Sequence, residues 1–267
     1  MNKLSGFLEL HKQGHKIVCL TAYTTPMAQS LAPHVDLLLV GDSMGTAIYG
    51  MDSTQGVSME MMCAHGAAVI RGASDVPVII DLPYGSYESA PALALSSAQR
   101  IIEETGADGV KLEGGVEMQE HIKAITDAGI AVMGHIGLLP QSAPNEGGYK
   151  IKGKSEEQIS RLIADAKAVE AAGAFSVVIE GTIDSAAELA SAAVSIPTIG
   201  IGASGACSGQ ILVSEDLLGF THGHRPKFAP DYGDVKGVID NAAKRYAEEV
   251  RSGAFPRAEY LYKKKAS

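Results

Sequence analysis

The sequence predicts a (β/α)8 barrel, in which a closed parallel sheet is surrounded by helices. Three observations support this fold class. Short apolar, β-branched runs typical of buried parallel strands recur along the chain. Ala-rich segments with helical periodicity separate several of these runs. The length of 267 residues is close to the roughly 250 residues of a typical single barrel.

The expected strands and helices alternate along the chain. We predict eight strands at 17–22, 37–41, 76–82, 109–113, 131–136, 176–180, 197–201 and 209–214, with helices at 92–105, 117–128, 156–172 and 185–193. Several helices end in a glycine, as at Gly106, Gly129 and Gly173, which suits the left-handed residue that closes a helix. An open doubly wound sheet is the alternative, but the dinucleotide fingerprint is missing.

The remaining segments complete one predicted domain, residues 1–267. Segments 43–60 and 138–155 follow the second and fifth strands and suggest lids or substrate loops. The glycine-rich stretch 200–205 lacks the phosphate-loop ending, and we interpret it as a tight strand-to-helix turn. A C-terminal tail holds one expected helix from Val235 to Arg251, and Lys263-Lys264-Lys265 suggests a solvated terminus.

Composition favours a cytoplasmic enzyme acting on small molecules. The chain has 22 Lys and Arg against 31 Asp and Glu, and the net charge of -9 disfavours nucleic acid and anionic membranes as partners. Cys19, Cys63 and Cys207 show no CxxC spacing, and three is a poor number for a disulfide framework. Neither a secretory signal nor a membrane-spanning apolar run is expected.

Acidic residues stand where four apolar runs stop, namely Asp42, Asp81, Glu113 and Glu180. In α/β barrels the loops after the strands build the active site, so these acids are expected to converge there. Asp42 and Asp81 offer the hard oxygen ligands that suit Mg²⁺. Because two carboxylates fill only part of the Mg²⁺ coordination shell, positions stay open for a chelating substrate. Alternatively, Asp42 caps a following turn.

Charged and basic residues nearby extend this candidate site. Lys111 and Glu113 lie two apart on one strand and point to the same side, where they form an ion pair or bind a ligand. Glu180 follows an apolar strand, which would raise its pKa toward the range of a general base, unless it lies in solvent. His135 could donate to a substrate oxygen or fill a polar niche. His222 and His224 lack metal-ligand spacing and are expected in a loop.

Motifs along nearly the whole chain resemble one enzyme family. They are Gly41–Gly45 (GDSMG), Tyr49–Thr54 (YGMDST), Asp81–Tyr87 (DLPYGSY), Lys111–Gly115 (KLEGG), Gly134–Ser142 (GHIGLLPQS), Gly147–Lys150 (GGYK), Gly200–Ala203 (GIGA) and Gly253–Pro256 (GAFP). In this order they resemble the ketopantoate hydroxymethyltransferases, also called 3-methyl-2-oxobutanoate hydroxymethyltransferases.

The resemblance implies a TIM barrel of the phosphoenolpyruvate/pyruvate type. Such an enzyme transfers a hydroxymethyl group from 5,10-methylenetetrahydrofolate to 3-methyl-2-oxobutanoate, giving ketopantoate for pantothenate and coenzyme A synthesis. It also implies one Mg²⁺ per subunit and a homodecamer. Carried over by position, Asp42 and Asp81 resemble the metal ligands and Glu113 a third acid at the metal. Ser43 and Lys111 resemble substrate contacts, and Glu180 resembles the proton acceptor.

Three positions depart from the family pattern. Thr24, Ser208 and Glu215 replace the usual Asp, Asp and His. None is a predicted metal ligand or the base, so the departures bear on folate affinity and oligomer contacts. Two alternatives remain: a Mg²⁺-dependent carbon–carbon lyase on the same barrel, and a non-catalytic barrel that binds a 2-oxo acid.

Overall fold

The computed structural model describes residues 3–221, 223, 225–230 and 232–263. The expectations for His222, His224, Lys264 and Lys265 lie outside these residues. Among the described residues, no helix combines the length and the apolar character that crossing a bilayer requires.

Eight parallel strands close into a barrel in chain order, because β1 pairs with both β2 and β8. The (β/α)8 prediction is thereby confirmed, and the open sheet is excluded. The register places Asp81 beside Lys111 and Glu113 beside His135 on neighbouring strands. The strands are β1 (Ile17–Thr21), β2 (Leu37–Val40), β3 (Val78–Asp81), β4 (Gly109–Glu113), β5 (Val132–Gly137), β6 (Ser176–Glu180), β7 (Thr198–Ile201) and β8 (Gly209–Leu212).

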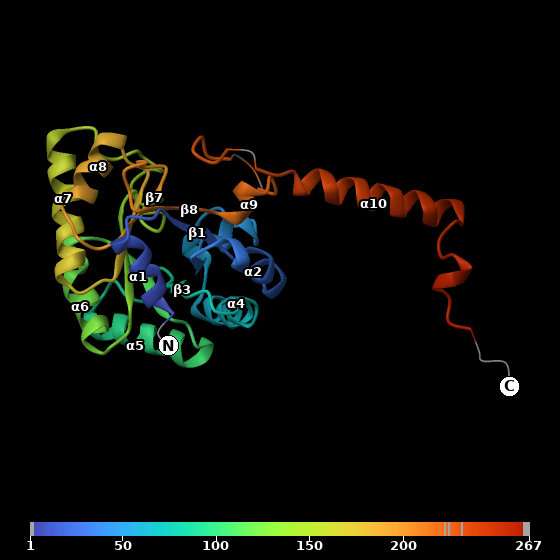
Figure 1. Ribbon diagram of the computed structural model, residues 1–267, viewed down its shortest axis with the longest axis horizontal. Coiled ribbons are helices and arrows are strands. Elements are labelled where there is room, and N and C mark those ends of the chain that lie inside the picture. The colour runs from blue at the N-terminus through green and yellow to red at the C-terminus, as the bar shows by residue number, and fades with distance from the viewer. Residues whose placement is uncertain (1–2, 222, 224, 231, 264–267) are drawn as a thin grey trace.

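Helices cover most of the barrel's outer face (Figure 1). The α-helices are α1 (Leu4–Lys12), α2 (Thr25–Leu31), α3 (Met44–Ala47), α4 (Met59–Gly72), α5 (Pro91–Thr105), α6 (Gln119–Asp127), α7 (Glu156–Ala171), α8 (Asp184–Ala192), α9 (Ser214–Leu217) and α10 (Val235–Ser252). Four 3-10 turns join them: η1 (Ala32–His34), η2 (Thr54–Gly56), η3 (Val116–Met118) and η4 (Ala258–Tyr260).

Local sequence signals explain where several helices begin and end. The hydroxyls of Ser58 and Ser155 accept hydrogen bonds from the backbone at the starts of α4 and α7, which satisfies an amide that the helix leaves unpaired. Gly106, Gly129 and Gly173 have φ between 75° and 89°, as predicted for residues that close helices.

Two apolar clusters hold the barrel together. The larger one lies between the strands and the surrounding helices. The smaller one fills the barrel interior. It includes Ile79, Met133 and Val178 from the strands, and Leu4 and Phe7 from α1. Because α1 precedes the first strand, its apolar side chains close the amino-terminal end of the barrel and leave the carboxyl-terminal end for a site.

The expected strand-to-helix turn at 200–205 is wrong. Residues 202–208 connect β7 directly to β8 without a helix. Gly202 has φ of 56°, a conformation that favours glycine, and Cys207 lies buried beneath the turn. The helix expected after β7 is therefore missing. Val18 on β1, which pairs with β8, keeps 47% of its surface exposed.

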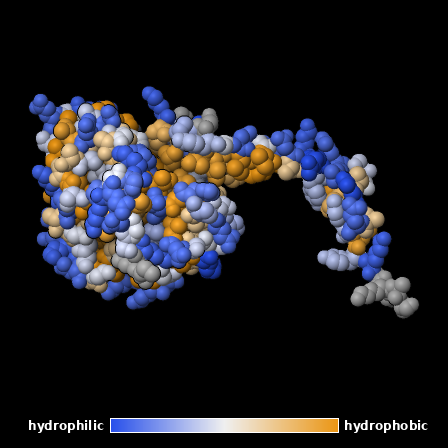
Figure 2. All heavy atoms as spheres, in the orientation of Figure 1, coloured by the Kyte–Doolittle hydropathy of each residue, from blue (hydrophilic) through white to orange (hydrophobic). Residues whose placement is uncertain are grey.

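The C-terminal helix α10 projects away from the barrel (Figure 1). The structure extends it from Val235 to Ser252, one residue beyond the prediction. None of its residues is buried, and Val238, Ile239 and Tyr246 are exposed. Figure 2 shows apolar surface running from the barrel onto the first part of this arm. An apolar helix face in water normally marks a contact surface.

Candidate active site

A cavity of about 540 Å³ opens at the carboxyl-terminal end of the barrel. The two segments predicted as substrate loops form part of its wall, through Thr46 and Thr54 from 43–60 and through Pro140 and Tyr149 from 138–155. All seven predicted site residues line it as well: Asp42, Ser43, Asp81, Lys111, Glu113, His135 and Glu180. The tertiary structure therefore brings the complete predicted set to one place.

Asp42, Asp81 and Lys111 form a group of buried charged side chains. Lys111 Nζ lies 2.8 Å from Asp81 Oδ1, and the Asp42 backbone N–H donates to Asp81 Oδ2 over 3.1 Å. Burial lowers the pKa of Lys111, but the neighbouring carboxylates of Asp81, Glu113 and Asp42 outweigh it and raise the pKa overall. Lys111 therefore stays cationic.

The pKa of Asp42 is raised to about 8. Burial is the largest cause, and repulsion from the carboxylates of Asp81 and Glu113 adds to it. The alternative, that Asp42 caps the following helix, is wrong. The residue at the N-cap position of α3 is Ser43, and no side chain caps this helix. Asp42 is instead a buried acid close to two further carboxylates, those of Asp81 and Glu113.

Gln141 links the separate acids of the site. Its side-chain amide donates to Asp42 Oδ2 over 2.8 Å and to the Leu82 carbonyl over 3.0 Å. Its backbone N–H donates to Glu113 Oε2 over 3.1 Å, and the Tyr87 hydroxyl donates to Gln141 Oε1 over 2.6 Å. Sequence reasoning missed Gln141 and Tyr87 as site residues, although both stand within quoted motifs, because neither follows a strand directly.

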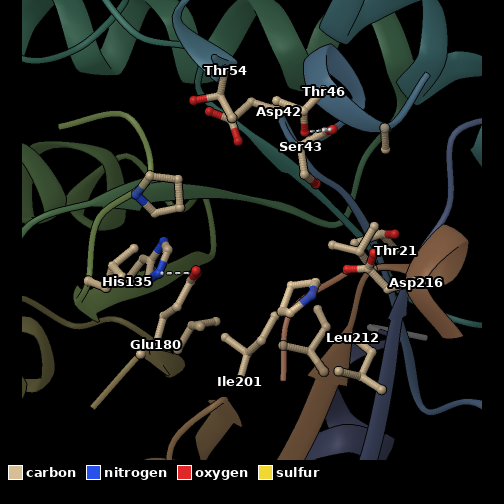
Figure 3. A pocket seen from close by; sticks show the side chains of 18 of the residues that line it. Thr21, Asp42, Ser43, Thr46, Thr54, His135, Glu180, Ile201, Leu212 and Asp216 are labelled. Carbon is tan, nitrogen blue, oxygen red and sulfur yellow. Dashed lines mark hydrogen bonds and ion pairs between the residues drawn. The ribbon is translucent and has the colours of Figure 1, made fainter. Parts of the chain in front are cut away.

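His135 lies between two acids. Its Nδ1 is 3.4 Å from Glu113 Oε1, and its Nε2 is 3.1 Å from Glu180 Oε2 (Figure 3). Burial and the Lys111 charge lower the pKa of His135, but the hydrogen bonds to Glu113 and Glu180 prevail and raise it to about 9. The raised pKa favours the protonated imidazole, although Nδ1 also lies 3.3 Å from Lys111 Nζ. His135 thus lines the cavity, and its contact with a substrate oxygen stays a prediction.

Glu180 is less buried than the other charged residues, with a side chain that is 17% exposed. Its surroundings are not the apolar ones that the sequence suggested, because the imidazole of His135 faces its carboxylate. Ser43 lies on the other side of the cavity, and its Oγ is 2.8 Å from the Tyr23 hydroxyl. Tyr23 is a further residue that sequence reasoning did not assign to the site.

The donor set fits a divalent cation bound by few protein ligands. Among the described residues, no three His, Cys, Asp or Glu side chains are arranged as a ready metal cluster. Asp42 and Asp81 nevertheless bring hard carboxylate oxygens to one buried corner of the cavity, where burial first and the neighbouring carboxylates second raise the pKa of Asp42. Mg²⁺ commonly takes one or two carboxylates and completes its shell with water and substrate oxygens, so two acids suffice.

The fold and the site define an enzyme built on a (β/α)8 barrel, with its charged centre at the carboxyl ends of the strands. Solved structures share the fold. Phosphonopyruvate hydrolase in complex with oxalate and Mg²⁺ matches with a TM-score of 0.62 at 13% identity, covering 97% of this chain and 93% of that chain. 2,3-Dimethylmalate lyase, of the PEP mutase/isocitrate lyase superfamily, matches with a TM-score of 0.60 at 15% identity, covering 100% and 92%.

The chain belongs to the ketopantoate hydroxymethyltransferase family, whose model matches residues 2–258. Its relatives include the 3-methyl-2-oxobutanoate hydroxymethyltransferases of Mesorhizobium japonicum, 57% identical over 94% of this chain and 88% of the relative, and of Bordetella petrii, 51% identical over 92% and 90%. The predicted family is confirmed, and the protein is an enzyme, a hydroxymethyltransferase of pantothenate biosynthesis.

Proposed function

We propose that the protein transfers a hydroxymethyl group from 5,10-methylenetetrahydrofolate to C3 of 3-methyl-2-oxobutanoate and so forms ketopantoate. C3 loses a proton and forms a carbon–carbon bond to the one-carbon unit of the folate. Both C–N bonds of that unit break, water supplies its hydroxyl oxygen, and tetrahydrofolate leaves with the C3 proton and one proton of the water on its two nitrogens. The observation that carries the proposal is the convergence of acids and cations in one cavity of a chain with this family membership.

Asp42 and Asp81 hold one Mg²⁺ per subunit in this proposal, and Glu113 stands as a third acid beside it. When bound, Mg²⁺ supplies a Lewis acid that polarises the 2-oxo acid and offsets its developing negative charge. Gln141 orients Asp42 and Glu113 through the two hydrogen bonds described above. Ligand positions fixed by such outer hydrogen bonds keep the carboxylates from rearranging.

Lys111 and Ser43 bind the substrate. The ammonium of Lys111 lies beside Asp81, where it can attract a substrate carboxylate or the oxygen that gains charge as C3 is deprotonated. Ser43 Oγ is held by the Tyr23 hydroxyl and can donate to a substrate oxygen. Both groups are set before the substrate arrives, which limits the reorganisation needed during the reaction.

Glu180 accepts the C3 proton, and His135 positions it. The imidazole of His135 contacts Glu180 Oε2 and so holds that carboxylate in the cavity wall. His135 also contacts Glu113, so one imidazole connects the proposed base with the third acid beside the proposed metal site. Donation to a substrate oxygen, which the sequence suggested, requires one of the two ring N–H groups to turn from its carboxylate to the substrate.

The test is detection of ketopantoate by mass spectrometry from 3-methyl-2-oxobutanoate and 5,10-methylenetetrahydrofolate, with Mg²⁺ and with a chelator in parallel. We expect product only where Mg²⁺ is free. Exchange of the C3 proton in D2O, followed by NMR, reports the first step without folate. A folded protein that gave neither product nor exchange would contradict the proposed function.

The lyase alternative has less support. Lyases of this barrel type use a nearby cysteine as acid, but Cys19, Cys63 and Cys207 are all buried and none lines the cavity. The family membership points to the transferase instead. The non-catalytic alternative would predict loss of a charged site residue, whereas all five of Asp42, Asp81, Lys111, Glu113 and Glu180 are present in the cavity.

We further propose that the protein works in the cytoplasm as a single barrel domain with a C-terminal extension, assembled into a homodecamer as the family resemblance implies. The free thiols of all three cysteines suit a reducing compartment. The exposed apolar side chains of α10 and the uncovered Val18 on the outer barrel face support contacts between copies of the chain.

Sedimentation of the wild-type protein tests this assembly. We expect Ile239→Glu, on the apolar side of α10, to lower the measured mass, since a charge would enter a dry contact. Lys244→Glu, placed on another side of the same helix, serves as the control and should keep the wild-type mass. A wild-type mass near that of one chain would contradict the oligomer.

A further inference from the structure

The cavity is larger than a five-carbon 2-oxo acid requires. Its volume of about 540 Å³ lies in the range of roughly 300–1,000 Å³ that encloses drug-sized ligands. The charged residues described above occupy one part of the wall. Another part consists of apolar side chains from β7, β8 and the segment after α9, namely Ile201, Leu212, Pro226 and Phe228.

Asp216 provides an acid on this apolar part of the wall that the proposed mechanism does not use. It belongs to α9, directly after β8, and only 6% of its surface is exposed. In Figure 3 it lies beside Thr21, away from the His135–Glu180 pair. The Thr221 hydroxyl donates to Asp216 Oδ1 and so fixes the carboxylate in the cavity wall.

We propose that the Asp216 carboxylate binds the pteridine ring of the folate through the ring's 2-amino group and its neighbouring N3–H. This inference rests on the proposed function, because it assigns the subsite of that reaction's co-substrate. The two parallel N–H donors of the pteridine match the two oxygens of one carboxylate, as a guanidinium does. Each carboxylate oxygen has room for two hydrogen bonds, so the Thr221 contact does not block the ligand.

The surroundings of Asp216 suit a flat aromatic ring. Leu212 and Phe228 give apolar surface on which the pteridine can pack, while its polar edge meets the buried acid. Asp52 also lines the cavity but is exposed, so water competes for its carboxylate. A buried acid discriminates more strongly, because a ligand without the matching donors leaves it unpaired.

This placement is consistent with the proposed chemistry. Asp216 follows β8, whereas Glu180 ends β6, Asp81 ends β3 and Asp42 follows β2. The pteridine and the 2-oxo acid then enter from different parts of the barrel rim, with the one-carbon unit between them. Folate recognition and C3 deprotonation therefore depend on different side chains and can be separated experimentally.

Asp216→Asn tests the inference, because it keeps the size of the side chain but replaces one acceptor by a donor. We expect the KM for 5,10-methylenetetrahydrofolate to rise by about 10–100-fold, in line with the loss of hydrogen bonds to a charged group. The rate of folate-independent C3 proton exchange should stay at the wild-type value. Asp184→Asn, the same exchange at an exposed acid on α8 outside the cavity lining, is the control and should leave that KM unchanged.

A ligand change provides a second readout that a merely structural role would not affect. The wild-type protein should bind 2-desamino-2-methyl-tetrahydrofolate about 10–100-fold more weakly than tetrahydrofolate. Asp216→Asn should discriminate far less between the two. If that variant does not fold, the comparison is made on the wild-type protein alone, and equal binding of both ligands overturns the inference.

The outcomes separate the inference from the proposed function. Wild-type transferase activity together with an unchanged folate KM in Asp216→Asn overturns the inference and leaves the proposed function standing. A wild-type protein that exchanges the C3 proton but binds no tetrahydrofolate overturns both, because the one-carbon donor is then wrong.

Discussion

The two ends of the barrel are built from the same strands but differ in chemistry. At the amino-terminal end, Leu4 and Phe7 of α1 pack onto an apolar interior cluster and close it. At the carboxyl-terminal end, Asp42, Asp81 and Lys111 are buried around an open cavity. In β3, for example, the apolar residues Val78 to Ile80 precede Asp81, the last residue of the strand.

This difference separates stability from function within each strand. Apolar burial at the closed end stabilises the fold roughly in proportion to the area removed from water. At the open end, burial and the neighbouring carboxylates of Asp81 and Glu113 raise the pKa of Asp42. These buried acids are stable only beside a cation or a bound ligand. We therefore expect substitutions at one end to change catalysis and those at the other end to change the free energy of unfolding.

The largest effect is expected at the open end, from Glu180→Gln. Because the amide cannot accept the C3 proton, the exchange rate of 3-methyl-2-oxobutanoate should fall by about 10²–10⁴-fold. The midpoint of thermal unfolding should change little, since the side chain is partly exposed. Glu188→Gln, an exposed acid on α8, is the control. Exchange at the wild-type rate in Glu180→Gln would remove Glu180 as the base.

At the closed end, Phe7→Ala should act in the opposite way. Phe7 is 2% exposed and meets Phe175 edge-on, with ring centroids 5.6 Å apart. Its truncation should lower the free energy of unfolding by about 3–5 kcal/mol, measured by urea denaturation, while folded protein keeps its kcat. Phe220→Ala, at an exposed site, should cost far less. A fall in kcat without lost stability would contradict the separation of the two ends.

Glu215, on α9 after β8, is a buried acid that should make the stability of the open end depend on pH. Burial, aided by the Asp216 charge, raises the pKa of Glu215 from 4.5 to about 7. Between these values the folded state keeps a proton that the unfolded state has lost, so stability falls as pH rises through this window. The loss amounts to about 3 kcal/mol above pH 7. Glu215→Gln should remove this part of the pH dependence.

Denaturant unfolding of both proteins at pH 4.5 and pH 7.5 measures the difference. The wild-type protein should lose more stability across that interval than Glu215→Gln. Equal losses in the two proteins would mean that Glu215 titrates at its ordinary value despite its burial.

The smallest effect is expected from Gln141→Leu, which removes the amide that orients Asp42. The Mg²⁺ concentration needed for half-maximal C3 exchange should rise by about 10–100-fold, as for other groups that orient metal ligands. Gln55→Leu removes only a contact to the Gln141 carbonyl and provides the control. The same rise in both variants would point to a general disturbance of the loop.

Much of the site could be predicted because strand ends are visible in sequence. An apolar run followed by an acid, as at Asp81 and Glu180, predicts both the strand and a side chain that lines the cavity. Gln141 and Tyr87 could not be found in this way. They reach Asp42 and Glu113 from loops whose path depends on contacts 26 to 99 residues apart in the chain, and such contacts have no local periodicity.

By itself, the sequence determined the alternation of strands and helices, the glycines that close helices, and the acids at the strand ends, because each depends on local backbone preference or on burial with a regular period. Only the tertiary structure decided that α1 closes one end, that β7 joins β8 without a helix, and that His135 bridges Glu113 and Glu180. These features arise from packing and charge between distant segments, and the closure of the barrel brings those segments together.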